Sequence, residues 1–171
     1  MRKIKRAIIS LSNKENLSSI LKILNKYKIK ILSSGGTYKE IKKLRYKCTE
    51  ISEYTKFGEI LGGRVKTLHP KIHAGILSNR KNKLHKKELA KNKFKEIDLV
   101  IVNFYPFEDT LRSHSKHSKI IENIDVGGPT MVRAAAKNYD SVTVVTKIDQ
   151  YAKLVNELNL NSGGTTLKFR Q

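Results

Sequence analysis

"IDLVIVNFY", residues 97–105, is the most hydrophobic stretch of the chain. A short, nearly unbroken run of Val, Ile and Leu is typical of a central parallel strand that helices cover on both faces. Strand and helix patterns take turns on both sides of this run. We expect further strands at 6–12, 29–34, 47–52 and 141–146, and helices at 15–27, 37–44, 71–80, 83–92, 118–124, 130–138 and 150–158.

This alternation predicts an α/β layered fold, with a mainly parallel sheet and helices on both of its faces. A chain of 171 residues suits one domain with a real core and is short for two domains. Its hydrophobic share of 39% also favours a globular fold.

Three features of the sequence bear on the compartment. No apolar run of the sequence approaches the roughly 20 residues that a membrane helix needs. The basic start "MRKIKRAIIS" is followed by too few apolar residues for a signal peptide. The single cysteine, Cys48, allows no disulfide within the chain and is expected to be a buried, reduced thiol in a strand. The expected location is the cytoplasm.

The formal net charge of +20 has two explanations. Lys and Arg neutralise phosphates, so the charge could indicate a nucleic-acid partner. The lysines are, however, dispersed over nearly every segment, and the concentrated run at 79–95 includes Leu84, Leu89 and Ala90, as a solvated amphipathic helix would. We favour compositional bias, because no aromatic-rich or repeated binding motif accompanies the charge.

Ligands of parallel α/β sheets bind outside the carboxyl ends of the strands, and two polar turns are expected there. "SLSNK" (10–14) and "SSGGT" (33–37) each join a strand to a helix. Their glycines, hydroxyls and helix N-termini, with Lys14, form a cradle for an anion such as a phosphate. The alternative is that Ser12, Asn13 or Thr37 simply caps a helix. Neither turn matches a dinucleotide or ATP motif.

"GGRVKTLHPKIHAGIL" (62–77) gathers more polar and conformationally special residues than a solvated linker needs. Arg64 can fork onto a phosphate or carboxylate, while Lys66 is a point charge. His69 and His73 are four residues apart, but Pro70 lies between them and no zinc-protease motif is present. We therefore expect no metal.

The last two polar segments are "NFYPF" (103–107) and "NIDVGGPTMVRAAAKN" (123–138). Alternation along the strand sends Asn103 and Tyr105 to the same side, where Tyr105 could donate or relay a proton. Asp125 and Lys137 could divide acid and base work. The alternatives are a buried tyrosine with a satisfied hydroxyl, a capping Asp and a solvated Lys.

These motifs together resemble the inosine monophosphate (IMP) cyclohydrolase domain of the bifunctional purine biosynthesis protein, in order from about residue 6 to residue 170. The resemblance implies a Rossmann-like, methylglyoxal-synthase-like fold. It implies the closure of 5-formamidoimidazole-4-carboxamide ribotide (FAICAR) to IMP with loss of water, without a cofactor or metal. It also implies a homodimer.

The resemblance assigns site residues by position. Lys137 matches the family's catalytic proton donor and acceptor, and Lys66, Tyr105 and Asp125 match residues implicated beside it. The residues expected to surround the nucleotide are Ser12, Asn13, Lys14, Ser34, Gly35, Gly36, Thr37, Arg64, Val65, Lys66, Thr67, Val102, Asn103, Asp125, Val126 and Gly127.

Two departures from the family pattern are visible. Asn13 stands where the family commonly has Asp, which removes one charge near the expected phosphate. The family continues through further helices into a transformylase domain that makes FAICAR, whereas this sequence ends at "TTLKFRQ". We therefore expect residues 1–171 to form a cyclohydrolase domain shortened at its C-terminal end, with no transformylase activity.

Other functions of the same fold are possible. A nucleotide-sensing regulatory module would need the phosphate loops but not Lys137, Asp125 and Tyr105. Methylglyoxal synthase, which acts on a triose phosphate, is disfavoured by the segments at 64–77 and 125–138.

Overall fold

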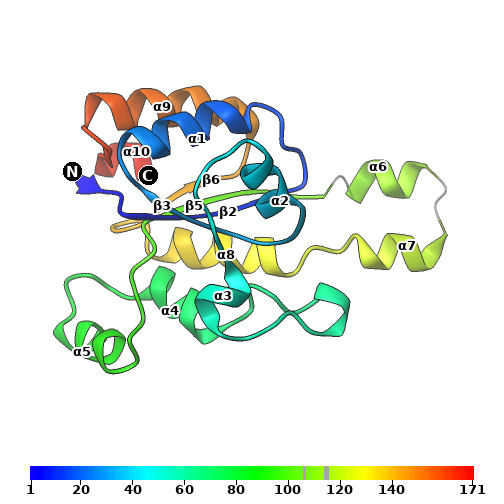
Figure 1. Ribbon diagram of the computed structural model, residues 1–171, viewed down its shortest axis with the longest axis horizontal. Helices are drawn as coiled ribbons and strands as arrows, with labels where there is room; N and C mark the ends of the chain where they lie inside the picture. Colours follow the sequence, from blue (N-terminus) through cyan, green and yellow to red (C-terminus); the bar gives the residue numbers. More distant parts are fainter. Residues whose placement is uncertain (106, 114–115) are drawn as a thin grey trace.

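A five-stranded, wholly parallel sheet forms the centre of the molecule, in the order β4-β3-β2-β5-β6 (Figure 1). The computed structural model describes residues 1–105, 107–113 and 116–171, so Pro106 of the predicted "NFYPF" loop lies outside the described residues. The strands are β2 (Arg6–Leu11), β3 (Lys30–Ser33), β4 (Thr49–Glu50), β5 (Leu99–Asn103) and β6 (Thr143–Val145). The predicted parallel α/β fold is confirmed.

The central pair of strands explains the apolar run at 97–105. Strand β5 lies between β2 and β6, with Ile8 opposite Val100 and Ile9 opposite Ile101 in the β2–β5 register. Its first four residues are all buried, because helices cover both sides of the sheet. A short antiparallel ribbon of β1 (Arg2–Lys3) and β7 (Gly164–Thr165) lies apart from this sheet.

Helices pack on both faces and create two cores. The first core joins one face to α1 (Leu17–Lys26), α9 (Tyr151–Leu160) and Ile41 of α2 (Gly35–Lys43). The second joins the other face to α3 (Ile51–Thr55), α4 (Pro70–Leu77) and α8 (Gly127–Lys137). The remaining helical segments are η1 (Leu61–Gly63), α5 (Lys83–Lys91), α6 (Phe107–Arg112), α7 (His117–Glu122), η2 (Ile148–Gln150) and α10 (Leu167–Arg170).

Helices α6 and α7 extend beyond the carboxyl edge of the sheet (Figure 1). Within the described part of the chain, no helix combines the length and the apolar character that crossing a bilayer requires.

Several element boundaries differ from the predictions, and two of these differences have a clear physical reason. The strand expected at 47–52 is confined to Thr49–Glu50, and α3 begins at Ile51, whose side chain fills the second core. Cys48 precedes this strand and is half-buried against the first core, and burial raises the pKa of its thiol to about 12. Helix α8 begins at Gly127, three residues earlier than expected, because Asp125 Oδ1 accepts a hydrogen bond from Gly128 N at 2.9 Å.

The carboxyl end of β2 is fixed by two side chains from neighbouring elements. The buried hydroxyl of Thr37 accepts from Leu11 N at 2.9 Å and donates to Leu11 O at 3.0 Å. Asn103, at the end of β5, accepts from the N–H groups of Ser12 (2.7 Å) and Asn13 (3.1 Å) through Oδ1 and donates to Asn13 O (2.6 Å). Thr37 and Asn103 thus tie the end of β2 to the first turn of α2 and to the end of β5.

We predict that Thr37→Val lowers the free energy of unfolding by about 1–3 kcal/mol, because it removes the hydroxyl that pairs with both the N–H and the C=O of Leu11 at nearly constant volume. Thr37→Ser keeps the hydroxyl and is the matched control, expected to lose less. Urea unfolding followed by circular dichroism measures both. Equal losses in the two variants would show that the hydroxyl does not fix the strand end.

Candidate functional site

A cavity of about 570 Å³ opens at the carboxyl edge of the sheet. Its walls are the turns after β2 and β3, the end of β5, the loop at 62–67, the end of α7 and the first turn of α8. All five polar segments predicted from the sequence contribute to this lining. Most of it comes from the segments at 10–14, 33–37, 62–77 and 123–138, and the segment at 103–107 contributes Asn103 and Tyr105. The cavity lies where ligands of parallel sheets bind.

The first turn of α2 and two lysine side chains form a cradle of positive potential in this cavity. Ser34 is the N-cap of this helix but makes no side-chain cap hydrogen bond, so its hydroxyl does not satisfy the first-turn N–H groups. A Cβ placed on Gly35 would lie 3.5 Å from Lys66 Nζ, and one on Gly36 would lie 3.7 Å from Lys14 Nζ. Two ammonium groups therefore approach the positive end of one helix, an arrangement that needs an anion between them.

Lys66 reaches the cradle across Gly63. A Cβ at Gly63 would approach Lys66 Cε to 2.7 Å, and the φ of +89° at Gly63 also favours glycine. Glu59 Oε2 lies 3.6 Å from Lys66 Nζ. Lys14 Nζ, on the other side of the cradle, donates to Ser12 O at 3.1 Å.

Arg64, on the same loop, is held by Glu122 of α7. Its Nη2 donates to Oε1 of Glu122, and its Nε donates to Oε2 at 3.4 Å. The pairing raises the pKa of Arg64 and lowers the pKa of Glu122. The predicted fork of Arg64 onto an anion is thus present in the structure, with a glutamate as the anion.

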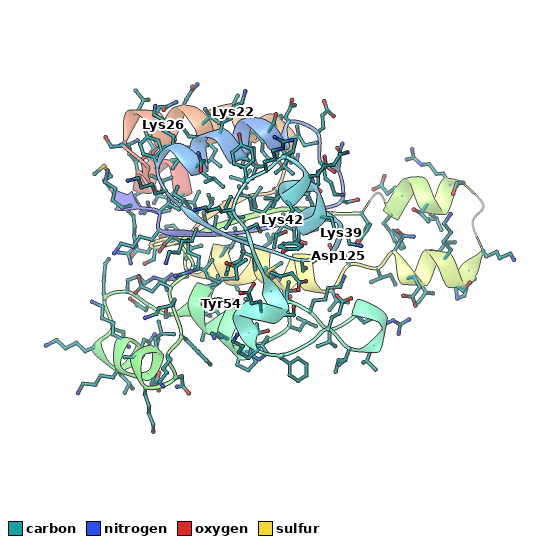
Figure 2. All side chains as sticks on the ribbon, viewed as in Figure 1. Lys22, Lys26, Lys39, Lys42, Tyr54 and Asp125 are labelled. Carbon is teal, nitrogen blue, oxygen red and sulfur yellow. The ribbon has the colours of Figure 1, made fainter. Side chains whose placement is uncertain are left out.

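Asp125 stands at the end of α8 that faces the cavity (Figure 2). The Arg64–Thr67 loop packs tightly against this helix end, since a Cβ at Gly127 would come within 2.5 Å of Thr67 Oγ1. Asp125 precedes the N-cap Val126, and its Oδ1 accepts from Gly128 N in the first turn of α8, as the capping alternative predicted. Asp125 also lines the cavity. Tyr105 lines the cavity and is 52% exposed, so the alternative of a buried tyrosine is wrong.

The two histidines of the loop have structural partners, His69 in helix α4 and His73 in the loop backbone. His69 is the N-cap of α4, and its Nδ1 accepts from Lys71 N at 3.1 Å. His73 hydrogen-bonds the backbone of Thr67, and burial lowers the pKa of its imidazole. Among the described residues, no group of three His, Cys, Asp or Glu side chains could hold a metal.

Four predicted site residues do not line the cavity. Lys137 is exposed at the last position of α8, about ten residues and roughly 15 Å of helix from Gly127, so the structure does not bring it beside Asp125. Val102 is 1% exposed and belongs to the second core. Val65 pairs with Ile60 in an isolated bridge that shapes the loop. The Oδ1 of the exposed Asn13 accepts from Glu15 N, and this Asx turn leaves the helix cap to Asn16.

The other predicted residues lie together around the cavity, and two of them hold the turn after β2 in place. The hydroxyl of Thr37 and the amide of Asn103 are bound to the backbone after β2, so these residues position the site. The remaining predicted residues that line the cavity are Ser12, Lys14, Ser34, Gly35, Gly36, Arg64, Lys66, Thr67, Tyr105, Asp125, Val126 and Gly127.

The sequence analysis missed the contribution of α7. Ile121, Glu122 and Ile124 line the cavity, and both isoleucines are exposed there, at 44% and 52%. The available signal was Glu122 itself, one of only 15 acidic residues in a chain with 35 basic ones.

The cationic surface outside the cavity is spread over several helices. The four labelled lysines, Lys22 and Lys26 on α1 and Lys39 and Lys42 on α2, are exposed and do not line the cavity (Figure 2).

The fold and cavity define a Rossmann-like α/β protein with a cavity lined by Lys14, Arg64 and Lys66 at the carboxyl edge of its sheet. More particularly, the chain belongs to the MGS-like domain family, whose model matches residues 16–130. Its likeness to a solved structure, the crystal structure of ForH, has a TM-score of 0.84 at 28% identity and covers 96% of this chain and 85% of that chain.

Curated relatives share more of the sequence. The chain is 45% identical to the bifunctional purine biosynthesis protein PurH of Bradyrhizobium diazoefficiens over 170 residues, 99% of this chain and 32% of the relative. It is 46% identical to PurH of Clostridium kluyveri over 168 residues, and 48% identical to PurH of Wigglesworthia glossinidia brevipalpis over 165 residues. These matches cover 34% and 31% of the two relatives, so the chain spans about a third of the length of the curated relatives it matches.

The lowered pKa of His73 gives a prediction for stability against pH. In the unfolded chain the imidazole titrates near its ordinary value of 6.5, and in the folded chain it titrates lower. Between these values the unfolded state binds more protons, so the free energy of unfolding falls as pH falls below about 6.5. Urea unfolding at pH 7.5 and 5.5 should show a smaller loss on acidification for His73→Gln than for the original chain. His117→Gln, an exposed control, should leave the loss unchanged; the same loss in all three would contradict the burial of His73.

Proposed function

We propose that this chain closes FAICAR to IMP with loss of water, as an IMP cyclohydrolase of purine biosynthesis. The observation that carries the proposal is that the segments resembling the cyclohydrolase family meet around one cavity, which pairs a phosphate cradle with Lys66, Tyr105 and Asp125. Its similarity to proteins named bifunctional purine biosynthesis proteins over 99% of the chain supports the same reaction.

The 5′-phosphate of the nucleotide would bind the first turn of α2 between Lys14 and Lys66. This placement directs the base along the cavity toward Tyr105 and the first turn of α8, where Ile124 and Val126 provide apolar surface. Holding the formyl and carboxamide groups of one substrate molecule in contact supplies much of the rate, because the reaction is intramolecular.

Ring closure needs proton transfers and charge stabilisation. The carboxamide nitrogen attacks the formyl carbon, a C–N bond forms, and negative charge develops on the formyl oxygen. Lys66 and the N–H groups at the start of α8 are the donors available to that oxygen. Asp125 can accept the proton that the attacking nitrogen loses, and Tyr105 can relay a proton to the oxygen to give a hydroxyl group. The formamide N–H gives up the second proton, and a C=N bond forms as the C–O bond breaks and the oxygen leaves as water. Every step uses groups of the chain and the substrate.

The test is IMP formation from FAICAR by the purified chain. Asp125→Asn keeps the oxygen that caps α8 and removes the base, so we predict that kcat falls roughly 10²–10⁴-fold. Binding of IMP, measured by calorimetry, should change much less. Asp149→Asn, in η2, is the control and should leave kcat unchanged.

Two results would contradict the proposal. Loss of IMP affinity in Asp125→Asn as large as the loss of kcat would remove Asp125 from the chemical step. A folded original chain that binds IMP without any turnover would favour the nucleotide-sensing module.

A further inference from the structure

The ion pair between Arg64 and Glu122 joins two parts of the cavity wall that are 58 residues apart in the sequence. Both Nε and Nη2 of Arg64 face the two carboxylate oxygens, which is the bidentate arrangement of guanidinium and carboxylate. The side chains are 63% and 57% exposed, and neither η1 nor α7 contains a buried residue. The pair therefore lies at the solvent side of the cavity, outside the cradle.

Apart from Asp125 at the start of α8, the charges that line the cavity divide into an inner and an outer set. The inner set is Lys14 and Lys66, whose ammonium groups flank the first turn of α2. Two positive charges match the dianion of one phosphate group. The outer set is Arg64 with Glu122, and its net charge is zero.

A second phosphate group attached to the first would need cationic partners beyond the cradle. Arg64 lines the same cavity as Lys66, and their Cα atoms are at most about 7 Å apart along the chain, so the guanidinium of Arg64 is a cation available to such a group. Glu122 occupies the fork of Arg64 and adds a carboxylate that repels further negative charge. Discrimination between ligands often depends on such a repulsive element as well as on attractive contacts.

We propose that Glu122 is a specificity-determining residue that restricts the cavity to ligands with a single phosphate group. It does so by holding the guanidinium of Arg64 and by placing a carboxylate where a second phosphate would otherwise find a cation. The inference rests on the proposed function in that it takes a nucleotide as the ligand.

The experiment compares the affinities of IMP and inosine diphosphate by titration calorimetry in the original chain and in Glu122→Gln. The amide cannot hold Arg64 as a carboxylate does, so we expect the diphosphate to gain roughly tenfold relative to IMP, the factor that one charge-assisted hydrogen bond provides. Glu108→Gln is the matched control, since Glu108 is an exposed glutamate of α6 that pairs with Arg112 at 3.6 Å. This control should leave the ratio of the affinities for inosine diphosphate and IMP unchanged.

Adding Arg64→Ala to Glu122→Gln should abolish the gain, because the freed guanidinium is its cause. An unchanged ratio in Glu122→Gln, or a gain that survives Arg64→Ala, would overturn the inference.

Inorganic phosphate and pyrophosphate, used as further probes, require no recognition of a base. In Glu122→Gln, pyrophosphate should gain affinity relative to phosphate even if the chain lacks cyclohydrolase activity. Failure of all four probes to bind the original chain would overturn the inference together with the phosphate cradle.

Discussion

The hydrogen bonds between Thr37 and Leu11 are the contacts on which the geometry of the site depends. Through one buried hydroxyl, the first turn of α2 is fixed to the last residue of β2. Asn103 attaches the next residues of the same turn to the end of β5. Lys14 follows this turn directly, so its ammonium group is presented to α2 by structure that is itself hydrogen-bonded. The cradle is therefore assembled before any ligand arrives, which is the condition for tight and oriented binding.

The opposite wall of the cavity, made by the loop at 62–67 and by α7, contains fewer buried residues. Gly63 lets the stem of Lys66 cross the loop, and Thr67 packs against Gly127 at the start of α8. Beyond these contacts the wall is made by η1 and α7, whose residues are exposed, and the pairing of Arg64 with Glu122 connects them. The inner part of the site is thus built on the buried residues Thr37 and Thr67, whereas the outer part is arranged by charge.

The sequence was sufficient to predict the parallel sheet, because strand β5 is apolar along nearly its whole length and helical spacing repeats on both sides of it. It was also sufficient to place the polar turns, since strand ends of a parallel sheet share one edge. It could not separate residues that bind from residues that position: Thr37 and Asn103 have side chains suited to either task, and only their partners decide. It also could not place Lys137, because Asp125 and Lys137 are close in the sequence yet stand at opposite ends of a helix. The role of Glu122 depends on a contact across 58 residues, which no local pattern records.

The most direct measurement is a crystal structure of the chain with IMP bound. Our account predicts that the 5′-phosphate lies against the N–H groups of the first turn of α2, within hydrogen-bonding distance of Lys14 Nζ and Lys66 Nζ. The base should lie toward Tyr105 and Asp125, and the Arg64–Glu122 pair should remain intact. A phosphate bound by Arg64 in place of Glu122, or IMP bound away from the carboxyl edge of the sheet, would contradict it.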